Sequence, residues 1–248
     1  MPSLRILVVN DDGIDAPGIR PLAVAAVAAG HEVVIAAPAR QWSGASAAIL
    51  VDDDADQVAV DRRQVPGVPE AFAVHAAPAM CVLLALRGSF GPRPDVVLSG
   101  INYGANTGRV LLHSGTAGAA LTAGVGGLRA LAVSLDVDQP SDALHWEDAA
   151  AAAVTLLPLL QAQPAATVLN LNAPNRPGAF EFREAPLATG GVVRTSSADG
   201  GDEEELRAAL GRAGAADAGS DLDLLAQGYA TVTAITPPGA VALQGALP

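Results

Sequence analysis

The stretch ILVVNDDGIDAPGI, residues 6–19, joins an apolar strand directly to two adjacent aspartates. Residues 6–9 have the short length and the β-branched composition of a buried strand. Asp11 and Asp12 follow one residue later, and neighbouring carboxylates repel each other and resist the loss of water. At the end of a buried strand, a bound cation would offset the repulsion between the two carboxylates. The alternative is a solvated turn, which aspartate and asparagine also favour.

Similar apolar runs alternate with alanine-rich stretches along the chain. Short runs of valine, isoleucine and leucine predict strands, and the alanine-rich stretches between them predict helices. The predicted strands cover residues 5–9, 31–38, 95–102, 130–135 and 168–174, and the predicted helices cover 17–30, 114–124 and 149–160. Near-continuous apolar strands separated by helices indicate an α/β fold, with a mainly parallel sheet and helices on both faces.

Other segments do not follow this alternation. Residues 52–70 are polar and contain proline, which predicts a loop or hairpin outside the sheet. Residues 196–221 are rich in glycine, alanine and acidic residues, and a short helix is predicted within them over 205–214. The apolar run that follows predicts a late strand over 225–235.

The composition narrows the class of protein. Of the 248 residues, 50% are hydrophobic and only 3% aromatic, so we expect a core of alanine, valine, leucine and isoleucine. The net charge of −12 argues against binding to a nucleic-acid polymer, which requires a basic face. With no signal-type segment and no apolar stretch long enough to span a membrane, we expect a cytoplasmic protein.

All 14 basic residues are arginine, and the absence of lysine excludes several classes of ligand-binding protein. A P-loop enzyme requires G-K-[ST]. A phosphorylation-receiver domain uses a lysine close to its acidic residues. A dinucleotide-binding dehydrogenase needs G-x-G-x-x-G after its first strand, whereas residues 10–18 read NDDGIDAPG.

Oxygen-bearing side chains follow three of the predicted strands. In an open parallel sheet, ligands bind beyond the carboxyl ends of the strands, so these side chains are candidates for one site. The donors are Asp11 and Asp12, Ser43 and Ser46, and Ser99 and Asn102. Hard oxygen ligands favour Mg²⁺, Mn²⁺ or Ca²⁺, and such a cation would relieve the repulsion between the two aspartates.

A candidate anion site follows in NYGANTGRVLLHSGTAGAALTAG, residues 102–124. Ser114, Gly115 and Thr116 open the predicted helix, where free N–H groups and the helix dipole favour phosphate. Asn106 lies in the glycine-rich loop before this helix and can donate from its side-chain amide. The alternative is that Ser114 or Thr116 only caps the helix.

These residues, in this order, resemble the SurE family of survival proteins, which are metal-dependent nucleotidases. The matching segments are NDDGI (10–14), APGI (16–19), SGAS (43–46), SGIN (99–102), GAN (104–106) and SGT (114–116), with weaker matches in LNLNAP (169–174) and LAQGYATVTAITP (225–237). The resemblance implies a Rossmann-like core and a C-terminal extension that exchanges between subunits. We therefore divide the chain into a catalytic core over residues 1–165 and a strand and hairpin extension over 166–248, which would serve oligomerisation.

The resemblance also implies a ligand set and a reaction. One divalent cation per subunit, Mg²⁺ or Mn²⁺, would be bound by Asp11, Asp12, Ser43 and Asn102. A metal-activated water would hydrolyse nucleoside 5′- and 3′-monophosphates, with Asp11 and Asp12 as the catalytic residues and Asp11 orienting or deprotonating the water. Asn106 and residues 114–116 would hold the phosphate, and the subunits would form a homodimer or homotetramer. The alternative is a non-catalytic nucleotide- or sugar-binding module on the same fold.

One position departs from the family pattern. The residue before SGT is usually tyrosine in the family and is His113 here, and we expect its ring to replace the tyrosine in packing rather than to contact phosphate. Base recognition is expected from the loops around residues 41–70 and from the C-terminal extension, which are the least patterned parts of the chain.

Overall fold

The computed structural model describes residues 2–52, 57–137, 143–190 and 217–240. The strands in these residues are β1 (Arg5–Val9), β2 (Glu32–Pro38), β3 (Val60–Arg63), β4 (Glu70–Val74), β5 (Val96–Tyr103), β6 (Arg129–Asp136), β7 (Val168–Pro174), β8 (Phe182–Glu184) and β9 (Ala230–Ile235). The helices are α1 (Ile19–Ala28), α2 (Pro78–Leu86), the 3₁₀ helix η1 (Arg109–His113), α3 (Gly115–Val125), α4 (Trp146–Thr155), α5 (Leu157–Ala162) and α7 (Asp221–Ala226).

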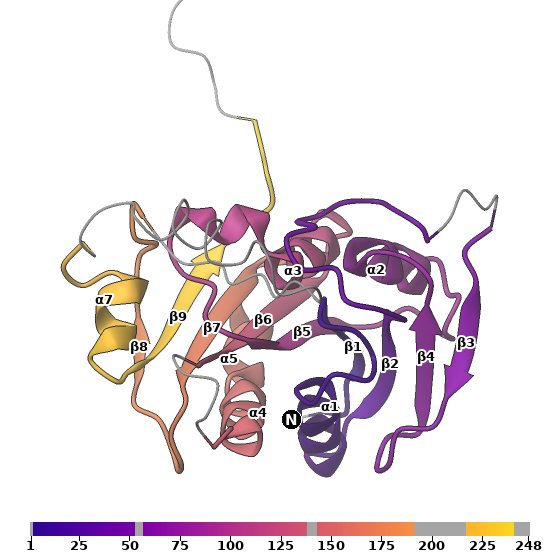
Figure 1. The fold of residues 1–248 in the computed structure, drawn as a ribbon, viewed down its shortest axis with the longest axis horizontal. Helices are drawn as coiled ribbons and strands as arrows, with labels where there is room; N and C mark the ends of the chain where they lie inside the picture. Colours follow the sequence, from indigo (N-terminus) through magenta and orange to yellow (C-terminus); the bar gives the residue numbers. More distant parts are fainter. Residues whose placement is uncertain (1, 53–56, 138–142, 191–216, 241–248) are drawn as a thin grey trace, which may run out of the picture.

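The strands form one sheet in the order β3-β4-β2-β1-β5-β6-β7-β9-β8 (Figure 1). All pairings from β4 through β7 are parallel, whereas β3 pairs antiparallel with β4 and β9 pairs antiparallel with β7. Helices α1, α4 and α5 cover one face, and α2 and α3 cover the other. The predicted α/β fold, with a mainly parallel sheet between two helical layers, is therefore confirmed.

The opening strand shows why its sequence is apolar without interruption. Ile6 and Val8 belong to the buried cluster under α1 and α4, whereas Leu7 and Val9 belong to the cluster under α2 and α3. Each of these four side chains has no exposed surface. A central parallel strand is buried on both faces, so its sequence lacks the alternation of polar and apolar residues seen in half-exposed strands.

Two predictions outside this pattern need correction. The expectation that residues 52–70 lie outside the sheet is wrong for β3, which forms its edge beside β4. All four β3 residues are exposed, so no apolar signal marks this strand in the sequence. The late strand over 225–235 is confirmed only from Ala230 onward, because α7 takes up the residues before Gln227. The helix predicted over 205–214 lies outside the described residues.

The C-terminal part of the chain continues the same sheet. The division predicted between residues 165 and 166 falls just before β7, which pairs with β6, and β9 and β8 then extend the sheet beyond β7. Within the described ranges, no helix is long and apolar enough to cross a membrane.

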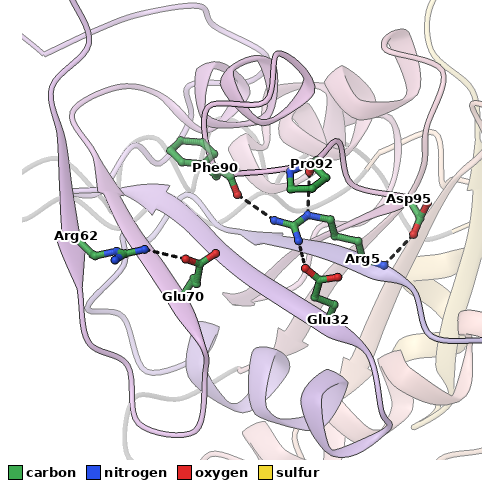
Figure 2. Close-up of polar contacts among 7 residues, drawn as sticks. All are labelled: Arg5, Glu32, Arg62, Glu70, Phe90, Pro92 and Asp95. Carbon is green, nitrogen blue, oxygen red and sulfur yellow. Dashed lines mark hydrogen bonds and ion pairs between the residues drawn. The ribbon is translucent and has the colours of Figure 1, made fainter.

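At the amino end of the central strands, Arg5 ties three segments together (Figure 2). Its Nε donates to the Pro92 carbonyl at 2.8 Å and Nη2 to the Phe90 carbonyl at 3.0 Å, while Nη1 pairs with Glu32. The Arg5 backbone N–H donates to Asp95 at 2.8 Å. Only 11% of the Arg5 side chain is exposed, so its removal would leave the carbonyl of the buried Phe90 without its donor, whereas Glu32 is 64% exposed and stays solvated.

Replacing Arg5 with methionine is expected to lower the free energy of unfolding by about 2 kcal/mol, since two carbonyls and a carboxylate lose a charged donor. The control is Arg62→Met, which removes the Arg62–Glu70 pair of Figure 2. Arg62 is 71% exposed, and we expect a loss below about 1 kcal/mol. Urea denaturation measures both values, and equal losses in the two variants would contradict the role given to Arg5.

Candidate metal and phosphate site

The predicted site residues gather where β1 ends. β1 lies between β2 and β5 in the sheet. The chain passes from β1 to β2 through α1 on one face, and it enters β5 from α2 on the opposite face. This reversal opens a crevice at the carboxyl ends of the strands, where ligands bind in such folds. The loop after β2 and the end of β5 both contact the turn after β1 there. The backbone N–H of Trp42 donates to the Asp11 carbonyl at 2.7 Å, and the backbone N–H of Tyr103 donates to Asp12 Oδ2 at 3.3 Å.

The turn that carries the aspartates is closed by its own neighbours. Asn10 is fully buried, and its Nδ2 donates to the Gly13 carbonyl at 2.8 Å. Gly13 has φ of +97°, a left-handed conformation that glycine adopts without strain. The next residue, Ile14, donates its N–H to the Pro38 carbonyl at 2.9 Å, which joins this turn to the end of β2. The turn is thus part of the fold rather than a solvated loop.

Asp11 lies against the first residues of α3. Only 4% of Asp11 is exposed, and the Thr116 hydroxyl donates to its Oδ1 at 2.5 Å. The backbone N–H groups of Gly115 and Thr116 also stabilise this carboxylate. A Cβ added to Gly115 would lie 2.7 Å from both Cβ and Oδ2 of Asp11, so the contact requires glycine. Two residues predicted to hold phosphate therefore contact a predicted metal ligand.

Asp12 and Ser43 are joined through one side-chain amide. Gln41 Nε2 lies 2.9 Å from Ser43 Oγ and 3.5 Å from Asp12 Oδ1. The amide group carries a partial positive charge and contacts the two oxygens that are predicted to share a cation. A cation bound by Asp12 and Ser43 would replace this bridge.

Asn102 is placed by an irregular end of β5. The pairing of β5 with β6 shifts between Ser99 and Asn102. At Gly100 an added Cβ would lie 2.3 Å from the Val133 carbonyl oxygen, so no larger residue fits. Asn102 is 3% exposed, and its Nδ2 donates to the Gly104 carbonyl at 2.7 Å. With Nδ2 engaged in this way, Oδ1 is the atom through which Asn102 could bind a cation.

Both aspartates have pKa values displaced from the ordinary range. Burial raises the pKa of Asp11, and the hydrogen bond from Thr116 partly opposes this effect. Burial, and then the negative charge of Asp11, raise the pKa of Asp12 to about 7. A cation beside the two carboxylates would lower both pKa values, because an opposite charge favours the ionised form.

The raised pKa of Asp12 predicts how stability depends on pH in the presence of a chelator. The folded state holds this proton up to about pH 7, whereas the unfolded chain releases it near 3.8. The contribution of Asp12 to stability is therefore greatest at acid pH and falls as the pH rises from about 4 to about 7. In thermal melts over this range, Asp12→Asn is expected to remove part of that fall. The exposed Asp15→Asn is the control, and an identical fall in wild type and Asp12→Asn would contradict the prediction.

Ser114 acts as the cap of α3. Its Oγ accepts from the Ala117 N–H at 3.1 Å, and the residue is 2% exposed. Its hydroxyl hydrogen remains a donor of the same side chain. Beside it, His113 ends η1 and is exposed, whereas its ring was expected to replace the tyrosine of the family in packing.

Asn106 is held by the ends of β6 and β7. Its Nδ2 donates to Ser134 Oγ at 2.9 Å, and its backbone N–H donates to Asn172 Oδ1 at 2.7 Å. The Asn106 carbonyl accepts from Nδ2 of both Asn170 and Asn172, at 2.9 and 3.0 Å. The loop between β5 and α3 is thereby fixed to the next two strands.

Sequence reasoning missed several of these contacts. It did not anticipate the Gln41 bridge or the hydrogen bond from Thr116 to Asp11. Asn170 and Asn172 did carry a signal, because two amides at alternate positions of an apolar strand must find partners inside the protein.

The oxygen donors fit a hard divalent cation. In the described part of the chain, no three His, Cys, Asp or Glu side chains are arranged so that they could hold a metal ion, so a cation here must use hydroxyl and amide oxygens as well. Asp11, Asp12, Ser43 and Asn102 provide such oxygens, which suit Mg²⁺ or Mn²⁺. The fit is supported by the Gln41 amide, which contacts Asp12 and Ser43 together.

A comparison with known families agrees with this architecture. The sequence model of the family described as "Survival protein SurE" matches residues 6–193. The chain belongs to the SurE family. The SurE match begins in β1 and includes every residue of the candidate metal and phosphate site.

Individual SurE relatives are similar over part of their length. A protein from Xanthomonas campestris pv. campestris (strain B100), named "5'-nucleotidase SurE", is 46% identical over 174 residues, which are 69% of this chain and 64% of the relative. A protein of the same name from Stenotrophomonas maltophilia (strain R551-3) is 45% identical over 176 residues, which are 70% of this chain and 65% of the relative. The matched region thus spans less than two thirds of these relatives.

A solved SurE structure shares the fold. "Crystal Structure of Sure Protein from Aquifex aeolicus" superposes with a TM-score of 0.68 at 24% identity, covering 94% of this chain and 93% of that chain.

Proposed function

We propose that this chain is a divalent-metal-dependent phosphomonoesterase that hydrolyses nucleoside 5′- and 3′-monophosphates to nucleoside and phosphate. The observation that carries the proposal is the pair of adjacent carboxylates, Asp11 and Asp12, in the crevice beside the first turn of α3. Burial raises the pKa of both, which makes them a pair that a cation stabilises. The names of the relatives, "5'-nucleotidase SurE", support the substrate class.

Each residue has a role in this proposal. Asp11, Asp12, Ser43 and Asn102 would bind one Mg²⁺ or Mn²⁺ per subunit. When bound, such a cation neutralises phosphoryl charge and lowers the pKa of water. The hydroxyl of Ser114, the start of α3 at Gly115 and Thr116, and the Asn106 amide hydrogen that does not face Ser134 would hold phosphate oxygens, because a helix start favours anions. Asp11 would orient the attacking water and accept its proton.

The reaction needs positioning more than covalent chemistry. Water adds to phosphorus in line with the ester oxygen, the bond between phosphorus and that oxygen breaks, and a proton passes to the departing nucleoside. Thr116 holds Asp11 through its hydroxyl, so the carboxylate faces the substrate in one orientation. As in the family, we expect the subunits to form a homodimer or homotetramer.

Phosphate release tests the proposal. AMP, GMP, adenosine 3′-monophosphate and a chromogenic phosphate ester are incubated with the protein and Mn²⁺ or Mg²⁺, and in parallel with a chelator. We expect release with at least one of the metals and loss of release when the metal is removed. Release that is unaffected by chelation would contradict metal dependence. Absence of release with either metal would favour a non-catalytic nucleotide- or sugar-binding module.

A further inference from the structure

A hollow of about 460 Å³ opens beside Asp12, within the size range of small-molecule sites. It is lined by the turn after β1, by the residues that follow β2, and by Tyr103 and Trp146. None of its lining residues comes from η1 or α3. The hollow is therefore separate from the candidate phosphate site, although it shares Asp12 with the candidate metal site.

Aromatic rings are concentrated around this hollow. The chain has two tryptophans and two tyrosines, and aromatic residues make up only 3% of it. Tyr103 and Trp146 line the hollow with ring centroids 6.4 Å apart, and Arg40, which also lines it, lies 4.2 Å above the Trp42 ring. Aromatic faces and guanidinium planes are the surfaces on which nucleic-acid bases stack. In a chain so poor in aromatic residues, this grouping points to a planar ligand.

The charges of the hollow exclude the phosphate end of a ligand. Asp12 and the exposed Asp15 contribute carboxylates. Arg40 is already paired with Asp52, at 2.6 Å between Nη2 and Oδ1. With the charge of Asp12 offset by the proposed cation, a phosphate dianion placed farther into the hollow would meet the Asp15 carboxylate, while Arg40 is already paired. A neutral group with hydroxyl or amino hydrogens instead finds acceptors in these carboxylates.

Gln41 connects the hollow to the metal ligands. It lines the hollow, and its Nε2 also contacts Asp12 Oδ1 and Ser43 Oγ. The hollow and the proposed metal ligands therefore adjoin each other at Asp12 and Gln41.

We propose that this hollow receives the nucleoside of the substrate, with the base against Tyr103 and Trp146 and with hydroxyl or amino groups facing Asp15 and Gln41. This inference rests on the proposed function and adds to it the location of base recognition. It places that recognition on the turn after β1, on β5 and on α4, rather than on the C-terminal extension.

The test compares two substrates that share the phosphate ester and differ in the base, AMP and ribose 5-phosphate. Tyr103→Leu removes a ring at the hollow and keeps the backbone N–H that contacts Asp12. We expect the ratio of kcat/KM for AMP to that for ribose 5-phosphate to fall about tenfold, as the loss of one stacking contact implies. Tyr229→Leu is the matched control, because this tyrosine lies beside Arg183 and lines no part of the hollow. It should leave the ratio unchanged.

A binding measurement separates this inference from the proposed function. Adenosine is titrated against the protein in a chelator while tryptophan fluorescence is followed, since Trp146 lines the hollow. We expect a saturable change in the wild type, and an affinity for adenosine that is at least fivefold weaker in Tyr103→Leu and in Ala16→Leu, which adds bulk to the lining of the hollow. If Tyr103→Leu hydrolyses AMP with the wild-type ratio of kcat/KM for AMP to that for ribose 5-phosphate, the inference is overturned and the proposed nucleotidase activity is not. If neither substrate is hydrolysed, absence of saturable adenosine binding would overturn the inference as well.

Discussion

Replacing Asp11 with asparagine is expected to lower metal-dependent phosphate release from AMP about a thousandfold, which is about 4 kcal/mol of barrier. The substitution keeps the shape of the side chain, and its Oδ1 can still accept the Thr116 hydroxyl. What it removes is one of the two negative charges that hold the cation, together with the acceptor for the proton of the attacking water. The measurement is kcat/KM for AMP at saturating Mn²⁺.

Stability in a chelator distinguishes this loss from unfolding. In the absence of metal, Asp11→Asn removes the charge that helps to raise the pKa of Asp12. The melting temperature of the variant should therefore equal or exceed that of the wild type near neutral pH. Asp61→Asn, at an exposed aspartate of the edge strand β3, should keep phosphate release from AMP within about twofold of wild type, in line with the small effects of surface substitutions. Turnover of Asp11→Asn at the wild-type rate would refute the role assigned to this carboxylate.

Gly115→Ala is expected to weaken Mn²⁺ binding and to lower turnover about a hundredfold, because the added methyl group displaces Asp11. The new Cβ would lie 2.7 Å from Cβ and Oδ2 of Asp11, so the carboxylate has to move. The helix itself should tolerate the change, because alanine favours helix more than glycine does. Calorimetric titration with Mn²⁺ measures the affinity, and AMP hydrolysis measures the turnover.

Gly239→Ala is the matched control, since nothing lies within 4 Å of a Cβ added there. This variant should bind Mn²⁺ and release phosphate as the wild type does. Wild-type Mn²⁺ affinity in Gly115→Ala would show that the contact between α3 and Asp11 does not control the metal site.

The central strands were predictable because each consists of apolar residues that are buried on both faces of the sheet. β1, β2, β5, β6 and β7 are apolar runs of suitable length, and the helices between them are alanine-rich. The edge strand β3 was not predictable, because its VDRR sequence is exposed throughout and carries no apolar signal; its pairing with β4 places it in the sheet. Edge strands owe their conformation to a neighbour rather than to their own side chains.

The candidate site divides in the same way. Adjacent aspartates after an apolar strand are a local signal, because their mutual repulsion has to be compensated wherever the chain folds. The contacts that hold them are not local: Thr116 lies 105 residues from Asp11, and Asn172 lies 66 residues from Asn106. The sequence of one segment cannot predict such a contact, because each partner by itself is equally typical of a helix cap or a turn.

The sequence by itself determined that this chain forms a parallel α/β sheet and that oxygen donors follow its strands. Only the tertiary structure decided which donors meet. The start of α3 contacts Asp11, Gln41 joins Asp12 to Ser43, and Tyr103 and Trp146 line one hollow with Asp12. The physical reason is that burial of apolar side chains acts on each residue separately, whereas the order of strands in the sheet sets which loops become neighbours.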